Sequence, residues 1–334
     1  MTAAPPVSFL TGATGFVGAA LARLLESKGH HLRLLCRKGN DRRNLEGLKN
    51  IEIIEGDLCD PATYATALTG CDNLFHVAAD YRIWVPDEAA MNRVNIDGTE
   101  SLMIAAHEAG IGKIVYTSSV ATLGIPKDGS QGTEDTPVAL SDMIGIYKRS
   151  KFLAEELVHR LIRETGLHAI IVNPSTPIGP RDIKPTPTGR IIVEAAAGRM
   201  PVYVDTGLNI AHVDDVAMGH WLALEKGKIG ERYILGGEDM DFGTLLKEIS
   251  DITGTPPPYF KIPRAPLFPL AYIAEAMARL TKIEPFITAD GLRMSKKKMF
   301  FSSDKAKNEL GYAPRPAKQA LQDAIIWFKD QGYF

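Results

Sequence analysis

Short apolar runs alternate with amphipathic stretches along the first half of the chain. Six of these runs are rich in β-branched residues and end in polar residues, Gly or Pro, so they predict strands: VSFLTG, HLRLLCR, IEIIEGD, NLFHVAA, KIVYTSS and HAIIVNPS. Several are almost continuously apolar, which is typical of strands buried on both faces. Because helical patterns separate them, the sequence predicts an α/β fold with a doubly wound parallel sheet.

The pattern changes after Pro174. Five prolines within 174–187 predict a long loop without periodicity, followed by a helix near 190–198. The stretch 214–227 then predicts another helix against the sheet, and 231–237 predicts another strand. We therefore expect the chain to leave the first lobe and return to it.

The last third of the chain predicts a smaller, mostly helical lobe. A length of 334 residues favours two lobes over a single core. Helical patterns separated by Pro-rich connections lie near 241–253, 265–281 and 317–331. We expect a dinucleotide-binding domain over 1–175 and about 205–237, and a substrate-binding lobe over about 176–204 and 238–334.

The charge balance bears on partners. With 38 basic and 40 acidic residues, the net charge of −2 gives no overall attraction for nucleic acid, so we expect no nucleic-acid partner. Cys36, Cys59 and Cys71 lack metal-ligand spacing, so we expect no metal site and a reducing, cytoplasmic location.

Neither end of the chain predicts export or a membrane span. The N-terminus lacks a basic segment followed by a long apolar one. The segment 265–280 is apolar but carries Pro269, Glu275 and Arg279, and it falls short of the roughly 20 apolar residues of a spanning helix. We expect it to cover a core or to contact a hydrophobic substrate.

A glycine-rich turn follows the first predicted strand. TGATGFVG places Gly12, Gly15 and Gly18 between that strand and a helical pattern. Missing Cβ atoms let a backbone approach a pyrophosphate, and a helix N-terminus faces the anion. At the first strand of an α/β alternation this predicts dinucleotide binding of the Rossmann type.

The end of the second strand indicates which dinucleotide binds. NAD sites usually carry a carboxylate there, whereas Cys36, Arg37 and Lys38 occupy this place. A guanidinium binds a 2′-phosphate bidentately, so we expect NADP(H), with Arg37 as the first contact. The alternative is a solvated basic loop. Asp57, after the third strand, is placed to accept a hydrogen bond from the adenine amino group.

The reactive groups follow the fifth strand. Ser118 and Ser119 lie at its carboxyl end, where parallel sheets gather their ligand sites. Tyr147 and Lys151 share one face of a helix; this spacing also arises by chance. As a set, they predict hydride transfer: Tyr147 exchanges a proton with the substrate oxygen, Ser119 polarises that oxygen, and Lys151 lowers a phenol pKa of about 10.

Together these motifs resemble a known family. TGATGFVG, HVAA, NIDGT, TSS, YxxxK and HVDDVA resemble, in order, the extended short-chain dehydrogenase/reductases, within them the dihydroflavonol 4-reductase-like branch. HVAADYRIW, DMIGIYKRSKFLAE and KKMFFSS are most similar to the hopanoid-associated sugar epimerases of bacteria. The resemblance implies that Ser119, Tyr147 and Lys151 are catalytic, that Asn95 ties neighbouring backbone together, and that the protein is a homodimer.

We expect two further sets of contacts. The cofactor contacts are Gly12, Thr14, Gly15, Phe16, Val17, Arg37, Asp57, Leu58, Ala78, Ala79, Tyr147, Lys151 and Pro174. The substrate contacts are Tyr81, Trp84, Thr122, Asn173 and Arg181, although Trp84 equally suits a core.

The substrate and the reaction are less narrowly predicted. Cations and hydroxyls in 173–190 suit a sugar, a polyol or a phosphorylated group. The resemblance adds a polycyclic lipid with a sugar-like side chain, and the run 296–298 fits either a membrane surface or a solvated face. Val120 and Ala121 replace the acidic pair of the related dehydratases, which disfavours dehydration. A net reductase and an epimerase both stay open; a non-catalytic NADP(H) sensor is disfavoured because Tyr147 and Lys151 are present.

Overall fold

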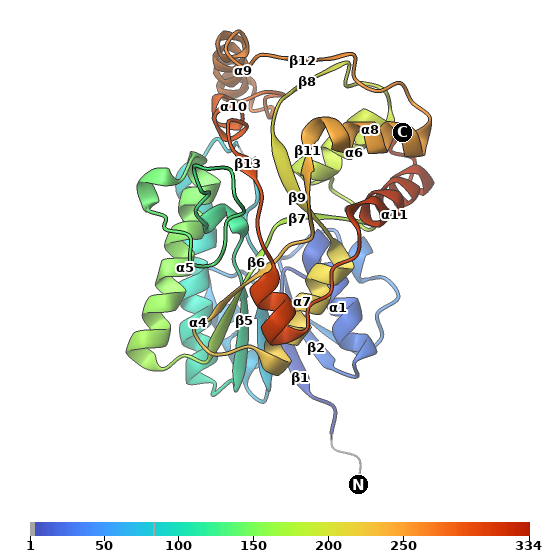
Figure 1. Cartoon of the computed structure of the whole chain (residues 1–334). Helices are drawn as coiled ribbons and strands as arrows, with labels where there is room; N and C mark the ends of the chain where they lie inside the picture. The colour runs from blue at the N-terminus through green and yellow to red at the C-terminus, as the bar shows by residue number, and fades with distance from the viewer. Residues whose placement is uncertain (1–3, 83) are drawn as a thin grey trace.

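A parallel sheet of seven strands is the centre of the computed structural model, which describes residues 4–82 and 84–334 (Figure 1). All neighbouring strands in it pair in parallel. From edge to edge the order is β10 (Arg232–Leu235), β6 (Ala169–Pro174), β5 (Lys113–Thr117), β4 (Asn73–His76), β1 (Val7–Thr11), β2 (His31–Cys36) and β3 (Ile51–Glu55). The six strands predicted in the first half are confirmed, and so is the later one within 231–237.

Helices cover both faces of this sheet because successive strand residues point to opposite sides. Leu10 packs in one core cluster with helices α1 (Phe16–Ser27) and α7 (Val213–Lys226). Its neighbour Phe9 packs in the other, with α4 (Gly98–Glu108) and α5 (Gly145–Thr165). The strands are therefore buried on both faces, which explains their nearly continuous apolar sequences. The doubly wound parallel fold is confirmed.

A second body of helices and small sheets lies above the carboxyl ends of the seven strands (Figure 1). Its helices are α6 (Pro187–Ala196), α8 (Phe242–Thr253), α9 (Leu267–Thr281), α10 (Ala289–Met294) and α11 (Ala317–Asp330). Residues of α6, α8 and α11 share one apolar core. The helices predicted near 190–198, 241–253, 265–281 and 317–331 are all present.

Two small sheets complete this second body, and the sequence analysis does not predict them. One sheet has the order β11-β9-β13, with β7 also pairing with β9; the other pairs β12 with β8. The strands are β7 (Thr176–Ile178), β8 (Val202–Val204), β9 (Gly207–His212), β11 (Glu238–Asp241), β12 (Phe260–Ile262) and β13 (Lys298–Met299). Within 205–237, α7 and β10 therefore lie with the large sheet, whereas β9 lies with the small one.

The remaining elements are short. They are α2 (Ala65–Leu68), α3 (Glu88–Asn92), 3-10 turns at 43–45, 61–63, 120–122 and 140–142, and π-helical turns at 93–97 and 306–310. Most of them lie between a strand and the helix that follows it in the chain, and Val94, in the turn at 93–97, lines the cavity described below.

Candidate active site

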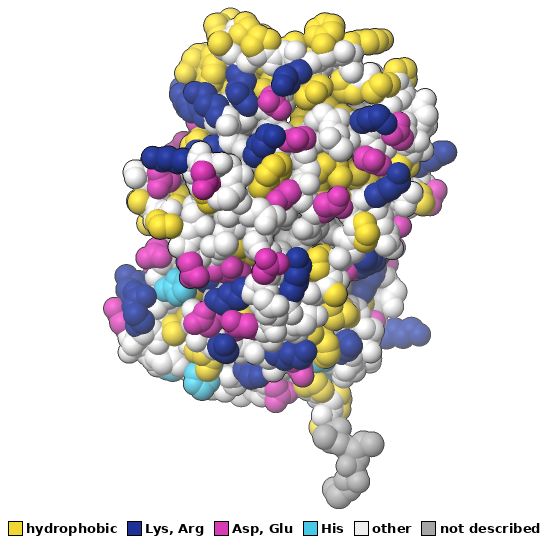
Figure 2. Space-filling model, viewed as in Figure 1, with side chains coloured by type: hydrophobic (Ala, Val, Ile, Leu, Met, Phe, Trp, Pro, Cys, Tyr) yellow, Lys and Arg dark blue, Asp and Glu magenta, His cyan; other side chains and the backbone are white. Residues whose placement is uncertain are grey.

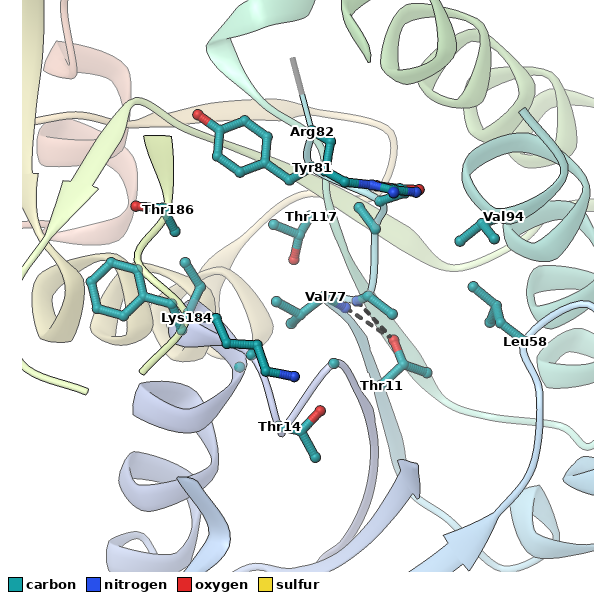
Figure 3. Close-up of a pocket in the computed structure, with 18 of the residues that line it drawn as sticks. Thr11, Thr14, Leu58, Val77, Tyr81, Arg82, Val94, Thr117, Lys184 and Thr186 are labelled. Atoms are coloured by element: carbon teal, nitrogen blue, oxygen red, sulfur yellow. Dashed lines mark hydrogen bonds and ion pairs between the residues drawn. The ribbon is translucent and has the colours of Figure 1, made fainter. Parts of the chain in front are cut away.

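A cavity of about 660 Å³ opens at the carboxyl ends of the parallel strands, which is within the size range of cofactor sites. In Figure 3, Leu58 and Val94 lie on one side of it, Lys184 and Thr186 on the other, and Tyr81 above. Every residue that we expect to contact the cofactor lines this cavity: Gly12, Thr14, Gly15, Phe16, Val17, Arg37, Asp57, Leu58, Ala78, Ala79, Tyr147, Lys151 and Pro174. Their contacts with a cofactor stay a prediction.

The glycine turn leaves no room for side chains at two of its positions. Gly12 has φ +79°, and a Cβ there would lie 2.7 Å from the backbone nitrogen of Ala78. A Cβ on Gly18 would lie 2.1 Å from the carbonyl oxygen of Gly12. Helix α1 begins after Gly15 without a side-chain cap and without an acidic residue in its first turn. Its first N–H groups are thus available to an anion, as a dinucleotide pyrophosphate requires.

Thr11 fixes this turn against the end of the fourth strand. Its hydroxyl accepts hydrogen bonds from the backbone N–H groups of Val77 (3.2 Å) and Ala78 (3.1 Å), drawn as dashed lines in Figure 3. His76, buried behind it, bridges Thr11 (2.8 Å) and Thr99 (2.9 Å). Burial, and then the charge of Lys151, lower the pKa of His76 to about 3. The imidazole is therefore neutral and acts as a structural bridge.

Two buried hydroxyls of the cavity wall are left without partners. The Oγ atoms of Ser118 and Ser175 have no hydrogen-bond partner in the part of the chain that the structure describes, and both residues line the cavity. Buried hydroxyls are normally hydrogen-bonded, so these two are free to bind a ligand. With the glycine turn and the uncapped helix, they fit a bound dinucleotide.

The basic residues after the second strand differ in their pairing. Arg42 pairs with Glu55 at 2.5 Å, and Arg43 pairs with Asp41 at 2.7 Å. Arg37 is exposed, lines the cavity, and forms no ion pair among residues 4–82 and 84–334. It is therefore the guanidinium of this loop that is available to a phosphate.

Ser119, Tyr147 and Lys151 all lie on the cavity wall. Ser119 caps the 3-10 turn after the fifth strand, where its hydroxyl accepts from the N–H of Ala121 at 3.1 Å. The rings of Tyr147 and Tyr81 meet edge to face with centroids 4.7 Å apart. The fold thus brings together the three side chains predicted to be catalytic, one from the turn after β5 and two from α5.

Lys151 is buried and directed to the end of the fifth strand. Its ammonium donates to the carbonyl of Thr117 (2.8 Å) and to the hydroxyl of Tyr116 (3.1 Å). Burial lowers the pKa of Lys151 to about 8, and the carboxylate of Glu155 opposes this shift. At neutral pH the ammonium stays charged, held by a carbonyl and a phenol rather than by a carboxylate.

The pKa of Tyr147 differs from the sequence expectation. Burial first, and then Tyr81, raise the pKa of its phenol above the ordinary value, while a hydrogen bond with Ser119 lowers it. The expected lowering by Lys151 is absent here because desolvation dominates and the ammonium binds Thr117 and Tyr116 instead. Tyr147 is therefore a neutral phenol, the form that donates a proton.

Asn95 ties the loop after the fourth strand to the helix that carries Tyr147. It accepts from the N–H of Asp80 (2.7 Å) and donates to the carbonyl of the same residue (3.1 Å). Its amide also donates to the hydroxyl of Ser150 (2.9 Å), which in turn donates to the carbonyl of Tyr147 (2.9 Å). This is the supporting role that the sequence analysis assigns to it.

The residues expected to bind substrate are divided. Tyr81 lines the cavity, whereas Trp84, Thr122, Asn173 and Arg181 are not among the described residues of its wall. Trp84 is partly buried. Arg181, at φ 75°, pairs with Asp214 of α7 at 2.6 Å and so points away from the cavity. Lys184, Thr186 and Ser175 line the wall instead.

Thr122 and Asn173 belong to a buried network behind Ser119. The amide of Asn173 donates to the carbonyl of Ser119 (3.1 Å) and to the carboxylate of Glu155 (2.9 Å). Thr122 also donates to Glu155 (2.9 Å), whose other oxygen pairs with Arg232 at 3.0 Å. The network holds the loop of Ser119. The sequence signal for it was a carboxylate at 155, one helical turn after Lys151 on the buried face.

Comparisons with known proteins agree with this geometry. Residues 8–236 match the model of the NAD dependent epimerase/dehydratase family. The "Putative dihydroflavonol 4-reductase" of Synechocystis sp. is 43% identical, over 97% of this chain and 95% of its own length. "Sterol demethylase protein B" of Methylococcus capsulatus is 33% identical, over 97% and 99%. The crystal structure of gox2253 is 60% identical, with a TM-score of 0.89 and coverage of 98% and 99%.

The family match begins at Ser8 within β1 and includes the other six strands of the large sheet, together with the three residues predicted to be catalytic. The similarity to these relatives extends over nearly the whole chain. The expectation from the sequence motifs is therefore confirmed at the level of the family. The chain belongs to the NAD-dependent epimerase/dehydratase family and is an enzyme of the extended short-chain dehydrogenase/reductase type, similar to its dihydroflavonol 4-reductase-like branch.

Proposed function

We propose that this protein is an NADP(H)-dependent oxidoreductase that acts on a hydroxyl or carbonyl of a sugar-like or polyol group. One observation carries the proposal: Ser119, Tyr147 and Lys151 line the same cavity as the glycine turn and the unpaired Arg37. A site that needed only to bind a nucleotide would have no use for a phenol, an ammonium and a hydroxyl on one wall.

The side chains divide the chemistry among them. The nicotinamide dinucleotide, when bound, supplies or accepts the hydride. Tyr147 donates its phenolic proton to the substrate oxygen as that oxygen gains negative charge, and Ser119 donates a hydrogen bond to the same oxygen. Lys151 lies on the same cavity wall, and we propose that its charge stabilises the phenolate as it forms, although in the structure its ammonium binds Thr117 and Tyr116. Arg37 would hold the 2′-phosphate of this cofactor, and Asp57 would hold its adenine.

Net reduction is the direction that the observations favour. Burial raises the pKa of the Tyr147 phenol, so at neutral pH this phenol carries the proton that a reduction passes to the substrate oxygen. The curated relatives include proteins named as reductases, and Arg37 suits NADPH, which a reductase consumes in each turnover. Epimerisation is the second candidate, because the family description names epimerases.

The substrate that we propose is a lipid carrying a sugar-like or polyol group, with a place in hopanoid synthesis. The resemblance of the sequence motifs supports it, and one relative is named for a sterol, another polycyclic lipid. Tyr81, Lys184 and Thr186 offer a ring, a cation and a hydroxyl for the polar part. We also propose that residues 1–175 with about 205–237 bind the dinucleotide, that about 176–204 with 238–334 bind the substrate, and that the protein is a homodimer.

The nucleotide that the protein carries tests the proposal. The purified protein is denatured, the released nucleotide is identified by mass spectrometry, and the emptied protein is titrated with NADPH and NADH. We expect an empty protein that binds NADPH at least about tenfold more tightly than NADH, because only NADPH presents a 2′-phosphate to Arg37. Stoichiometric retained cofactor would support the epimerase, which regenerates it in each turnover. Equal affinity for both nucleotides would contradict the assignment of NADP(H).

The alkaline side of the pH profile reports on Lys151. We expect kcat/KM to fall above a pH of about 8, because the pKa of Lys151 is lowered to about 8 and its charge, present below that pH, is lost above it. The assay follows NADPH oxidation with a ketone found by screening sugar, polyol and polycyclic lipid carbonyls.

Glu155→Gln is the matched variant for this prediction. The carboxylate of Glu155 raises the pKa of Lys151, so its loss should move the alkaline limb to lower pH while the folded protein still binds NADPH. Two results would show that Lys151 does not cause the alkaline fall in kcat/KM. One is an alkaline limb at the same pH in Glu155→Gln as in the wild type, and the other is a wild-type profile that is flat through pH 8.

A further inference from the structure

Helix α9 packs with its small residues inward and its large apolar residues outward. Ala271, Ala274 and Ala278 are buried. Leu270, Ile273, Met277 and Leu280 recur every three or four positions, so they form one stripe along the helix, and all four are exposed. A surface helix normally buries such a stripe. Packing against the core alone would favour the opposite orientation of α9, with the large apolar side chains buried and the alanines exposed.

Exposed apolar side chains are concentrated around this helix. Nine of the fourteen large hydrophobic side chains that are exposed among the described residues lie between 259 and 286. The exposed fractions reach 85% at Leu280 and 81% at Phe286. We call Leu270, Ile273, Met277, Leu280, Ile283 and Phe286 the α9 surface. Hydrophobic side chains gather along the top of the molecule in Figure 2, where α9 lies in Figure 1. A patch of this kind marks an interaction site.

Unpaired positive charge lies beside the α9 surface. The segment 259–298 holds eight Lys and Arg and three Asp and Glu, a net charge of +5 in a chain of −2. All three carboxylates are engaged: Glu275 accepts from the N–H of Ala289, Glu284 pairs with Arg190, and Asp290 pairs with Arg293. By contrast, no ion pair within the described ranges involves any of four cations, Arg279, Lys282, Lys296 and Lys297.

We propose that the α9 surface docks the protein on a membrane that contains anionic lipids. An apolar stripe flanked by cations is the pattern of helices that lie in a bilayer interface, with each nearby Lys or Arg contributing roughly 1 kcal/mol toward anionic headgroups. A second copy of the chain fits less well, because it would bring two faces of net charge +5 together. No described helix is both long and apolar enough to cross a bilayer, so the helix lies on the surface.

The position of the α9 surface places the bilayer beside the cavity. Glu284, within the segment, pairs with Arg190 of α6 at 2.9 Å. Helix α6 begins directly after Thr186, a residue of the cavity wall. Docking therefore orients the second body of the molecule toward the lipid. This inference concerns the surface alone and stands whether or not the proposed reaction is correct.

Vesicle flotation of the full chain tests the proposal. Vesicles of phosphatidylcholine with about one third phosphatidylglycerol are compared with vesicles of phosphatidylcholine alone. We expect the protein to float with the anionic vesicles, to bind the neutral ones about tenfold more weakly, and to lose binding as salt screens the cations. Equal flotation with both vesicles would overturn the electrostatic part of the proposal.

Matched variants distinguish vesicle binding through the α9 surface from nonspecific binding through other exposed apolar side chains. Ile273→Gln, Met277→Gln and Leu280→Gln together keep helix-forming residues and alter only exposed positions, so folding should be preserved and is checked by circular dichroism. We expect about tenfold or greater loss of binding to the anionic vesicles. The control, Ile229→Gln with Ile326→Gln, changes exposed isoleucines elsewhere and should float like the wild type.

Two results would overturn the proposal. One is a triple variant that floats as well as the wild type. The other is a wild type that floats with neither kind of vesicle. If that wild type also sediments as a dimer, and the triple variant sediments as a monomer, the α9 surface binds a second copy of the chain.

Discussion

Replacing Tyr147 with Phe is expected to lower kcat by about 10³-fold while leaving the Kd for NADPH within about twofold of the wild type. The substitution removes only the phenolic oxygen, so the ring keeps its edge-to-face contact with Tyr81. Without that oxygen, the substrate oxygen would have to take its proton from water. Steady-state kinetics and a fluorescence titration with NADPH measure the two quantities separately.

Tyr81→Phe is the matched control, because it removes a second phenol from the wall of the same cavity. Its ring lies 4.7 Å from that of Tyr147 and is partly exposed to solvent. We expect less than about tenfold loss of kcat, since this phenol is not the proton donor. If Tyr147→Phe keeps most of its activity, or if both variants lose equally, Tyr147 is not the acid.

Replacing Arg37 with Asp is expected to lower the affinity for NADPH by about 100-fold or more, and the affinity for NADH by only a few-fold. The change removes a charge-assisted bidentate contact with the 2′-phosphate and puts a carboxylate in its place, which favours a ribose hydroxyl instead. Titration of each nucleotide into the emptied protein measures both affinities.

Arg42→Ala serves as the control for this variant. Its guanidinium lies in the same loop but pairs with Glu55 at 2.5 Å, so its loss should change both affinities little. An equal loss of NADPH and NADH affinity in Arg37→Asp would show that Arg37 does not bind the 2′-phosphate. A loss in Arg42→Ala as large as that in Arg37→Asp would assign the effect to the loop's general charge.

The large sheet was predictable because its strands are buried on both faces and therefore carry long apolar runs. The strands of the two small sheets have two to six residues each and show no comparable pattern. Strand β9, for example, belongs to a sheet built from segments that are far apart in the sequence, β7, β11 and β13. Such pairing is decided by tertiary contacts rather than by local propensity.

The cofactor side of the candidate site was predictable because sequence motifs fix its backbone. The substrate side was less predictable, because its residues were assigned only from their position near a strand end. Asn173 and Pro174 are neighbours on β6, but their side chains point to opposite sides. Pro174 therefore lines the cavity, whereas Asn173 joins the network of Glu155. Arg181 adopts a positive φ and reaches Asp214, which a reading of charge and loop position does not reveal.

The order of the strands across the large sheet has a consequence for biosynthesis. Strands β1 to β3, with the glycine turn, make up one edge, and β4, β5, β6 and β10 add in turn on the other side. A ribosome therefore releases the cofactor half of the sheet before the half with the reactive side chains. Arg232 on β10, the last strand of the large sheet to emerge, pairs with the carboxylate of Glu155 beneath the Ser119 loop. A nascent chain halted before β10 would contain the glycine turn. It would lack the guanidinium that pairs with Glu155 in the folded protein, so this carboxylate would stay in contact with water.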